Sequence, residues 1–224
     1  MRATSKRPIS AGKPRPEIFL RTAQMLGAQK PVGVGDRLET DVAGAINARM
    51  PALHVLTGVH SARDVVNAPK GKRPSFVGID LSALNEVHPP ALHHRDGTWT
   101  SGVSQQIRIV RGGNIEIADV PIFEDGGTVT ISIDTFRALV AASWDYADER
   151  RAVKCPELIV VPNDDPAGTV TEPNKELPEA AEDESPSEVM SAVTAEEMPT
   201  AVEDGDFDEG NATTQSEEPG AYDD

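Results

Sequence analysis

The 224 residues carry their charges unevenly along the chain. Residues 1–162 contain 20 Lys and Arg against 17 Asp and Glu, a net charge of +3. Residues 163–224 contain one Lys against 20 acids, a net charge of −19. A strongly acidic segment with few aromatic residues cannot bury enough apolar surface to offset its ordering entropy. The composition therefore predicts roughly 160 folded residues, in one or two small domains, and a disordered acidic tail at 163–224.

Several classes of protein are excluded by the same composition. No apolar run approaches the ~18 residues of a membrane span, and the first residues lack the apolar core of a signal peptide. The single cysteine, Cys155, permits no internal disulfide and fits a reducing cytoplasm, where we expect the protein to be. The nearly neutral charge of residues 1–162 argues against sequence-independent nucleic-acid binding. An enzyme, an enzyme fragment or a binding module remains, with neither a membrane nor a nucleic acid as partner.

The first elements in chain order have the pattern of an α/β fold, in which short apolar runs alternate with helix-period segments. Pro14 and Pro16 suit the start of a helix that Gly27 can end. The spacing of apolar residues and the position of helix-capping residues predict the further strands and helices. We expect strands at 32–35, 52–56 and 75–79, and helices at 41–49 and 81–85.

A change of pattern marks a second region. Residues 88–98 contain Pro89-Pro90 and Asp96-Gly97 and are predicted to be a linker between a first region, 1–87, and a second domain, 99–162. In that domain apolar residues alternate with a period of two between glycine-rich turns, which predicts a small antiparallel meander ending at Ile133. A helix with one apolar face follows at 134–149 and can cover the sheet.

Two clusters near the start of the chain carry candidate chemistry. Gly12 and Lys13 lie before the first predicted helix, and Asp36 and Asp41 follow the first predicted strand. A lysine can neutralise a phosphate, and carboxylates at the carboxyl end of a strand can hold Mg²⁺ or orient what holds it. A dinucleotide fingerprint fails because Leu38 stands where Gly is needed. A P-loop fails because no Ser or Thr follows the lysine.

These motifs resemble the haloacid dehalogenase (HAD) superfamily of hydrolases. The resemblance is carried by Ile9–Phe19, Val34–Ala45 and Val55–Val59, and it covers residues 8–85. It is closest to the carboxy-terminal portion of class IIA members, which have a large α/β cap and include nitrophenyl phosphatase-like, phosphoglycolate phosphatase-like and glycerol-phosphate phosphatase-like enzymes. It implies part of a Rossmann-like, three-layer α/β core. Residues 99–155 resemble, less closely, a small acetyltransferase-like domain that some members append.

The resemblance also implies a role for each motif residue. Lys13 matches the lysine that steadies the attacking carboxylate and the phosphate, with Gly12 beside it in the substrate-binding loop. Asp36 matches the acid that ligates Mg²⁺, and Asp41 matches a second acid that supports the metal site indirectly. Gly35 would keep the backbone open around them. The implied reaction is attack of an aspartate on a small phosphorylated metabolite, followed by hydrolysis of the aspartyl-phosphate.

One departure from the family pattern alters this expectation. The family's nucleophile motif (Asp-x-Asp), its Ser/Thr motif and its cap all precede the lysine, whereas only 12 residues precede Lys13 here. We therefore expect a truncated or split enzyme, inactive as a lone chain, with an exposed sheet edge at 32–35. That edge would invite an N-terminal complementing fragment or self-association. The alternative is a non-catalytic scaffold whose acidic tail binds a basic partner.

The remaining candidates favour simpler interpretations. Residues 204–210 contain two Asp-x-Asp pairs, but no apolar strand precedes them and an EF-hand would need Gly, not Glu209, at its sixth position. His88, His93 and His94 lack metal-binding partners at matching spacing, and Cys155 is predicted to be an inert thiol. The second domain lacks an acetyl-coenzyme loop, so we expect it to be non-catalytic. Asn211 heads a glycosylation sequon by pattern only.

Overall fold

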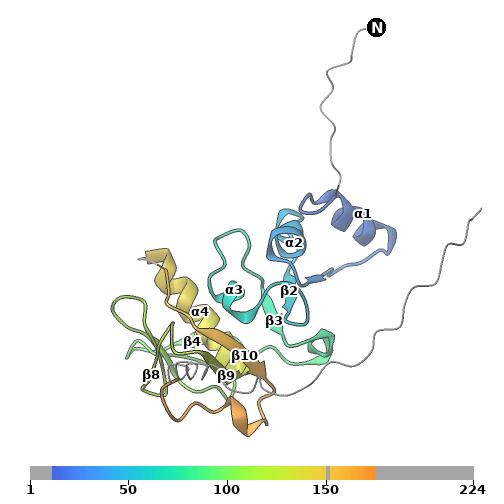
Figure 1. The fold of residues 1–224 in the computed structure, drawn as a ribbon. Coiled ribbons are helices and arrows are strands. Elements are labelled where there is room, and N and C mark those ends of the chain that lie inside the picture. The colour runs from blue at the N-terminus through green and yellow to red at the C-terminus, as the bar shows by residue number, and fades with distance from the viewer. Residues whose placement is uncertain (1–11, 150–151, 175–224) are drawn as a thin grey trace, which may run out of the picture. The chain divides into compact units, whose positions relative to one another are not determined.

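The first described elements build a parallel sheet with helices beside it. A computed structural model describes residues 12–149 and 152–174, all within one compact unit, Met1–Ala181. The sheet order is β1-β2-β3, and both pairings are parallel (Figure 1). Its strands are β1 (Gly33–Gly35), β2 (Ala52–Val55) and β3 (Phe76–Gly78); its helical segments are α1 (Glu17–Met25), α2 (Ala43–Asn47), α3 (Ala62–Val66) and the 3₁₀ turn η2 (Leu81–Asn85). The predicted mixed α/β fold with a parallel sheet is confirmed.

Two helical segments differ from the sequence prediction. The helix expected at 41–49 begins earlier, as a π-helical turn η1 (Leu38–Val42) that runs into α2. The amide of Val42 donates to the carbonyl of Arg37, five residues back, which widens this turn. Helix α3 was not predicted, although Ser61 and Asp64 form a reciprocal capping box at its start.

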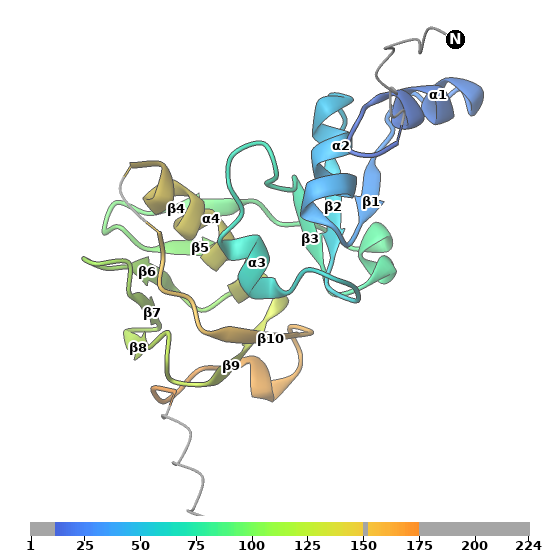
Figure 2. The same ribbon diagram turned by 45° about the horizontal axis from the view of Figure 1, so that its top comes forward.

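A second region contains a five-stranded antiparallel sheet and the longest helix among the described residues. Figure 2 shows α4 lying beside this sheet, and the fully buried Phe136 and Leu139 of α4 belong to the shared core. The sheet order is β4-β5-β6-β7-β8. The elements are β4 (Ala91–His93), β5 (Trp99–Ser101), β6 (Ile107–Ile109), β7 (Ile115–Ile117), β8 (Val120–Ile122), β9 (Thr128–Ser132), α4 (Ile133–Glu149), β10 (Glu157–Val161) and the 3₁₀ turn η3 (Pro166–Gly168).

The predicted meander is only partly right. Strands β6 and β7 pair antiparallel as predicted, and β8, which was not predicted, extends them. Strand β9 instead pairs in parallel with β10, which was also not predicted. A strand, a helix and a second strand in succession allow this pairing, because α4 carries the chain back to the starting edge. Period-two alternation shows which face is buried and says nothing of strand direction.

Two segments expected to be irregular are structured in part. The predicted linker 88–98 contains β4, which pairs with β5 because a turn at Asp96-Gly97 reverses the chain. The predicted tail from 163 first packs on the second region. The side chain of Gln105 bonds both the amide and the carbonyl of Val170, and Val170 itself is buried. Residues 1–11 and 175–224, including the motif at 204–210 and Asn211, lie outside the described residues.

No described helix is long and apolar enough to cross a membrane.

Candidate functional site

Lys13 and Asp41, which are 28 positions apart in the chain, are brought together by the fold. The Lys13 ammonium lies 2.5 Å from Oδ1 of Asp41, whose side chain is only 10% exposed. The other oxygen of Asp41 accepts a 3.2 Å hydrogen bond from the amide of Arg37. Because both carboxylate oxygens are engaged, Asp41 holds the lysine at the carboxyl end of β1.

The loop that carries Lys13 is fixed to α2 by a second contact. The side-chain amide of Asn47 donates to the carbonyl of Pro14 at 2.8 Å. The Arg15 amide donates to the Gly12 carbonyl at 3.1 Å, which closes a turn around Lys13. Gly12 therefore helps to shape this loop, and the Lys13 side chain remains half exposed.

Asp36 follows β1 directly and is held by the loop after β2. The amide of Val59 donates to Oδ2 of Asp36 at 2.7 Å, and the His60 amide donates to the Asp36 carbonyl at 3.2 Å. The hydrogen bond from Val59 holds the pKa of the Asp36 carboxyl below its ordinary value. Asp36 is therefore ionised at neutral pH, as a metal ligand must be.

Two glycines leave space for these carboxylates. A Cβ at Gly58 would collide with the Asp36 carboxylate, and a Cβ at Gly35 would collide with the Asp41 side chain. Gly35 was predicted to keep the backbone open, and the structure gives the reason. Any larger residue at either position would displace an acid of the site.

The described residues fit part of a Mg²⁺ site. Mg²⁺ is commonly bound through one or two carboxylates, together with waters and substrate phosphate. Asp36 supplies an ionised carboxylate beside a glycine that leaves room for it. Asp41 is engaged by Lys13 instead. No group of three His, Cys, Asp or Glu side chains that could hold a metal occurs within 12–149 and 152–174. A complete site would need further oxygen ligands.

His60, which the sequence does not single out, links the loop after β2 to the segment that follows Asp36. Its Nδ1 accepts a hydrogen bond from the Leu38 amide at 3.2 Å, and its Nε2 lies 2.8 Å from a carboxylate oxygen of Glu39. His60 thereby joins the loop after β2 to the start of η1. Its position directly after the Thr57-Gly58-Val59 motif was the available signal.

The histidines of residues 88–98 lie apart from this site. His88 bonds the carbonyl of Ala83 and the guanidinium of Arg137, and His93 stacks on Trp99. His94 bonds the Thr100 hydroxyl. They form no metal cluster with one another in the described part of the chain. Burial raises the pKa of the Cys155 thiol to about 12, in line with the predicted inert thiol.

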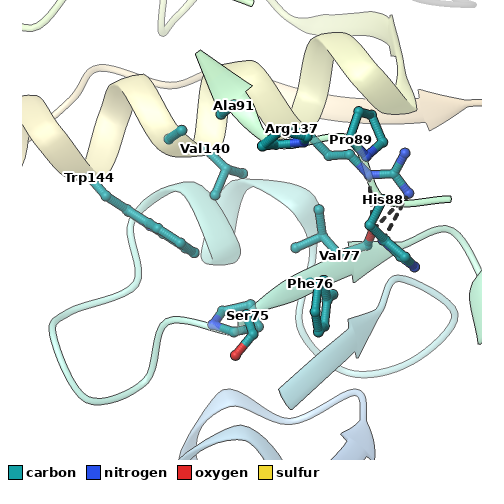
Figure 3. A pocket seen from close by; sticks show the side chains of 12 residues that line it. Ser75, Phe76, Val77, His88, Pro89, Ala91, Arg137, Val140 and Trp144 are labelled. Atoms are coloured by element: carbon teal, nitrogen blue, oxygen red, sulfur yellow. Dashed lines mark hydrogen bonds between the residues drawn. The ribbon is translucent and has the colours of Figure 1, made fainter. Parts of the chain in front are cut away.

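A separate apolar cavity of about 350 Å³ lies between β3 and α4. Figure 3 shows Val77 pointing toward Val140 of α4, and Phe76 and Trp144 also line the cavity. At one end Arg137 donates to the carbonyl of Val77 and pairs with Asp134 at 2.8 Å. The charge of Arg137 is thus balanced by Asp134. Neither Lys13 nor the two acids of the candidate site line this cavity.

Comparison with known proteins finds relatives for the segment that carries the lysine and the two acids. Residues 10–84 match the family described as HAD-hydrolase-like. D-glycerol 3-phosphate phosphatase of Mycobacterium tuberculosis is 32% identical over 144 residues, 64% of this chain and 38% of that protein. Acid sugar phosphatase of Staphylococcus aureus is 37% identical over 82 residues, 36% of this chain and 31% of that protein.

Two solved structures are also similar to parts of the chain. The glycerol phosphate phosphatase of M. tuberculosis in complex with magnesium has a TM-score of 0.45 and 28% identity, covering 71% of this chain and 42% of that one. The 4-nitrophenylphosphatase of Thermotoga maritima has a TM-score of 0.34 and 34% identity, covering 37% and 31%.

The matched segment carries the Lys13, Asp36 and Asp41 motifs. Over residues 10–84 the resemblance to HAD-like hydrolases that the sequence predicts is confirmed. The chain spans less than half the length of these phosphatases. The alignment of 144 residues extends past the residues 8–85 of the predicted resemblance. The likeness of the second region to acetyltransferases stays a prediction.

Proposed function

We propose that the chain supplies the lysine and acidic half of a Mg²⁺-dependent phosphatase site for small phosphate monoesters. The observation that carries this proposal is the Lys13–Asp41 pair, which brings the lysine to the end of β1, where Asp36 follows. Ligands of open α/β sheets bind at the carboxyl ends of the strands. A cation and an ionised acid at that edge suit a phosphate and its metal ion.

Each residue has a distinct role in this proposal. Lys13 neutralises negative charge on the phosphate, and Asp41 is a positioning residue that holds the ammonium in place. Asp36 holds Mg²⁺, and Val59 keeps Asp36 ionised and oriented. When bound, Mg²⁺ would stabilise the charge that develops on the phosphate oxygens.

A second polypeptide segment supplies the attacking carboxylate in this proposal. No Asp-x-Asp motif occurs in residues 12–149 or 152–174. Within the described residues β1 pairs only with β2, so its other edge is open to a further strand. Beside β1, helix α1 buries none of its residues, and Ile18, Met25 and Leu26 are each at least half exposed. A complementing strand could pair with β1 while its flanking residues cover α1.

Mg²⁺ titration followed by amide NMR tests the proposed metal site. The amides of Asp36, Gly58 and Val59 should shift on titration in the wild-type chain, and Asp36→Asn should abolish these shifts. Asp119→Asn is the matched control, because it makes the same charge change at a side chain 83% exposed and remote in sequence from the motifs. Shifts that persist in Asp36→Asn would refute the metal assignment and favour the scaffold alternative.

A hydrolysis assay tests the proposal that the site is incomplete. The lone chain should not hydrolyse nitrophenyl phosphate in Mg²⁺, because its described residues contain no Asp-x-Asp nucleophile motif. Turnover that Asp36→Asn abolishes would show a complete site and contradict the proposal. DNA upstream of Met1 that encodes an apolar strand ending in Asp-x-Asp, followed by a cap, would identify the complementing segment.

Open edges also pair with copies of themselves, so we expect the isolated chain to self-associate through β1. Sedimentation at several concentrations measures this. A monodisperse monomer with a cooperative thermal transition would argue against an open apolar edge.

A further inference from the structure

A cavity of about 350 Å³ opens beside the loop that holds Asp36. One wall is formed by the loop after β2, including Val59, and another by β10 of the second region, including Ile159. Both side chains are large and apolar, and they are 58% and 53% exposed. The cavity therefore presents apolar surface at the carboxyl end of β2.

Val59 connects this cavity to the proposed phosphate site. Its amide donates to the Asp36 carboxylate at 2.7 Å, and the same residue lines the cavity. The next residue, His60, bonds the backbone of Asp36 and of Leu38. A ligand group in the cavity would thus lie against the loop that orients the metal-binding carboxylate.

Both walls are fixed before any ligand binds. The capping box of Ser61 and Asp64 anchors the end of the loop to α3. Arg63 of α3 then donates to Glu157 of β10 at 2.8 Å and to Glu124 at 3.0 Å. These bonds tie β10 to the helix that follows the loop, so the cavity is preorganised and little ordering entropy opposes binding.

The lining selects the chemistry of the ligand. His60 is the one titratable side chain among the described residues that line the cavity, and Glu39 and Leu38 already engage its ring. None of the described lysines, arginines or carboxylates lines the cavity. Thr57 and Ser61 also line the cavity, but most of its side chains are aliphatic and none carries a free charge, so it favours an apolar group over a charged one.

We propose that this cavity is the subsite for the organic group of the phosphate ester, and that it selects apolar, above all aromatic, groups. The proposal rests on the proposed function, because it needs the phosphate at Lys13 and Asp36. It assigns Ile159, a residue of the second region outside residues 10–84, to substrate selection.

Two phosphate esters that differ only in the organic group test the subsite. Methyl phosphate and phenyl phosphate are titrated into the full chain with Mg²⁺, and binding is followed by NMR. Phenyl phosphate should bind about tenfold more tightly, because its ring is desolvated in the cavity. Ile159→Ser should reduce this preference to about threefold or less and leave methyl phosphate binding unchanged.

Two further variants distinguish a loss of ligand preference from a loss of folded structure. Leu92→Ser removes an equally exposed aliphatic side chain, 54% exposed on β4, and should leave the preference for phenyl phosphate unchanged. Ile159→Leu should retain the preference, because it keeps the apolar wall. Both affinities are read with each variant's circular dichroism, so a variant that fails to fold is recognised.

The outcomes distinguish the two proposals. If methyl phosphate binds in an Asp36-dependent manner but phenyl phosphate binds no better, the subsite is wrong and the proposed function stands. An Ile159→Ser variant with an unchanged preference would likewise overturn the subsite alone. If methyl phosphate fails to bind with Mg²⁺, or binds equally well to Asp36→Asn, the proposed function fails and the subsite falls with it.

Discussion

A buried histidine on the central strand of the parallel sheet should destabilise the native fold. His54 of β2 is fully buried, and neither ring nitrogen has a hydrogen-bond partner among the described residues. A buried polar group without a partner costs about 1–3 kcal/mol. Leucine fits a buried strand of this apolar composition. His54→Leu should therefore raise the free energy of unfolding at neutral pH by about 1–3 kcal/mol.

The pH dependence of stability gives a second signature of the same residue. Burial lowers the pKa of His54 below its ordinary value of 6.5, and it outweighs the nearby backbone of His60 and the carboxylates of Asp36 and Asp64, which favour the charged form. Below pH 6.5 the unfolded chain binds a proton that the folded chain does not. Stability is therefore fully present above about pH 6.5 and falls, as the pH drops toward the folded-state pKa, by up to about 1.4 kcal/mol per pH unit.

Urea denaturation between about pH 5.5 and pH 8 measures both effects. The His54→Leu variant should lose the part of the slope that lies below pH 6.5. His93→Leu is the control, because it makes the same substitution at an exposed histidine on β4. A His54→Leu variant that is less stable than wild type, or that keeps the wild-type slope, would refute the assignment of a buried, neutral and unpartnered histidine.

Three further substitutions test contacts of the second region, each by urea denaturation at neutral pH. Arg137→Met leaves the buried carboxylate of Asp134 without its cation and should cost about 3–5 kcal/mol; a near-neutral effect would mean that Asp134 has other compensation. Asn174→Ala removes two 2.8 Å hydrogen bonds to the backbone of Phe123 and should lower the free energy of unfolding by about 1–2 kcal/mol. An unchanged free energy would mean that residues 163–174 add no stability to the fold, as expected of the predicted tail. Trp144→Phe removes the indole hydrogen bond to α3 and should cost about 1 kcal/mol, and an unchanged stability would show that this bond contributes nothing net.

The lysine and the two acids could be found from the sequence because each stands within a few residues of a recognisable strand or helix signal. Lys13 precedes a proline-initiated helix, and Asp36 directly follows an apolar strand with glycines on both sides of its valine. The residue types and the spacing of the lysine and the two acids restrict the possible chemistry from the sequence alone. The pairing of Lys13 with Asp41 joins residues 28 positions apart, so only the fold could reveal it.

The contacts that hold Asp36 could not be predicted, because they come from backbone groups. An N–H such as that of Val59 exists at every residue except proline, so sequence gives no sign of where it points. Gly58 is the indirect signal, since a side chain there would occupy the position of the Asp36 carboxylate. The direction of β9 escaped prediction for a related reason, because side-chain alternation is the same in parallel and antiparallel strands.

Helix α1 couples the open face of the parallel sheet to the position of the lysine. Its nine residues are fewer than the ~12–15 at which an isolated helix becomes marginally stable in water, so packing must hold it in place. That packing comes from Phe19, whose ring lies directly on Gly44 so that no Cβ could be accommodated there. Lys13 lies four residues before α1, in the loop that leads into the helix. A segment that paired with β1 and covered the exposed side chains of α1 would therefore restrain this loop and bring an attacking group to the same edge. Binding of the complementing segment and completion of the proposed phosphatase site would then occur in one step. The exposed side chains that this segment would cover and the lysine that it would restrain belong to the same short helix and loop.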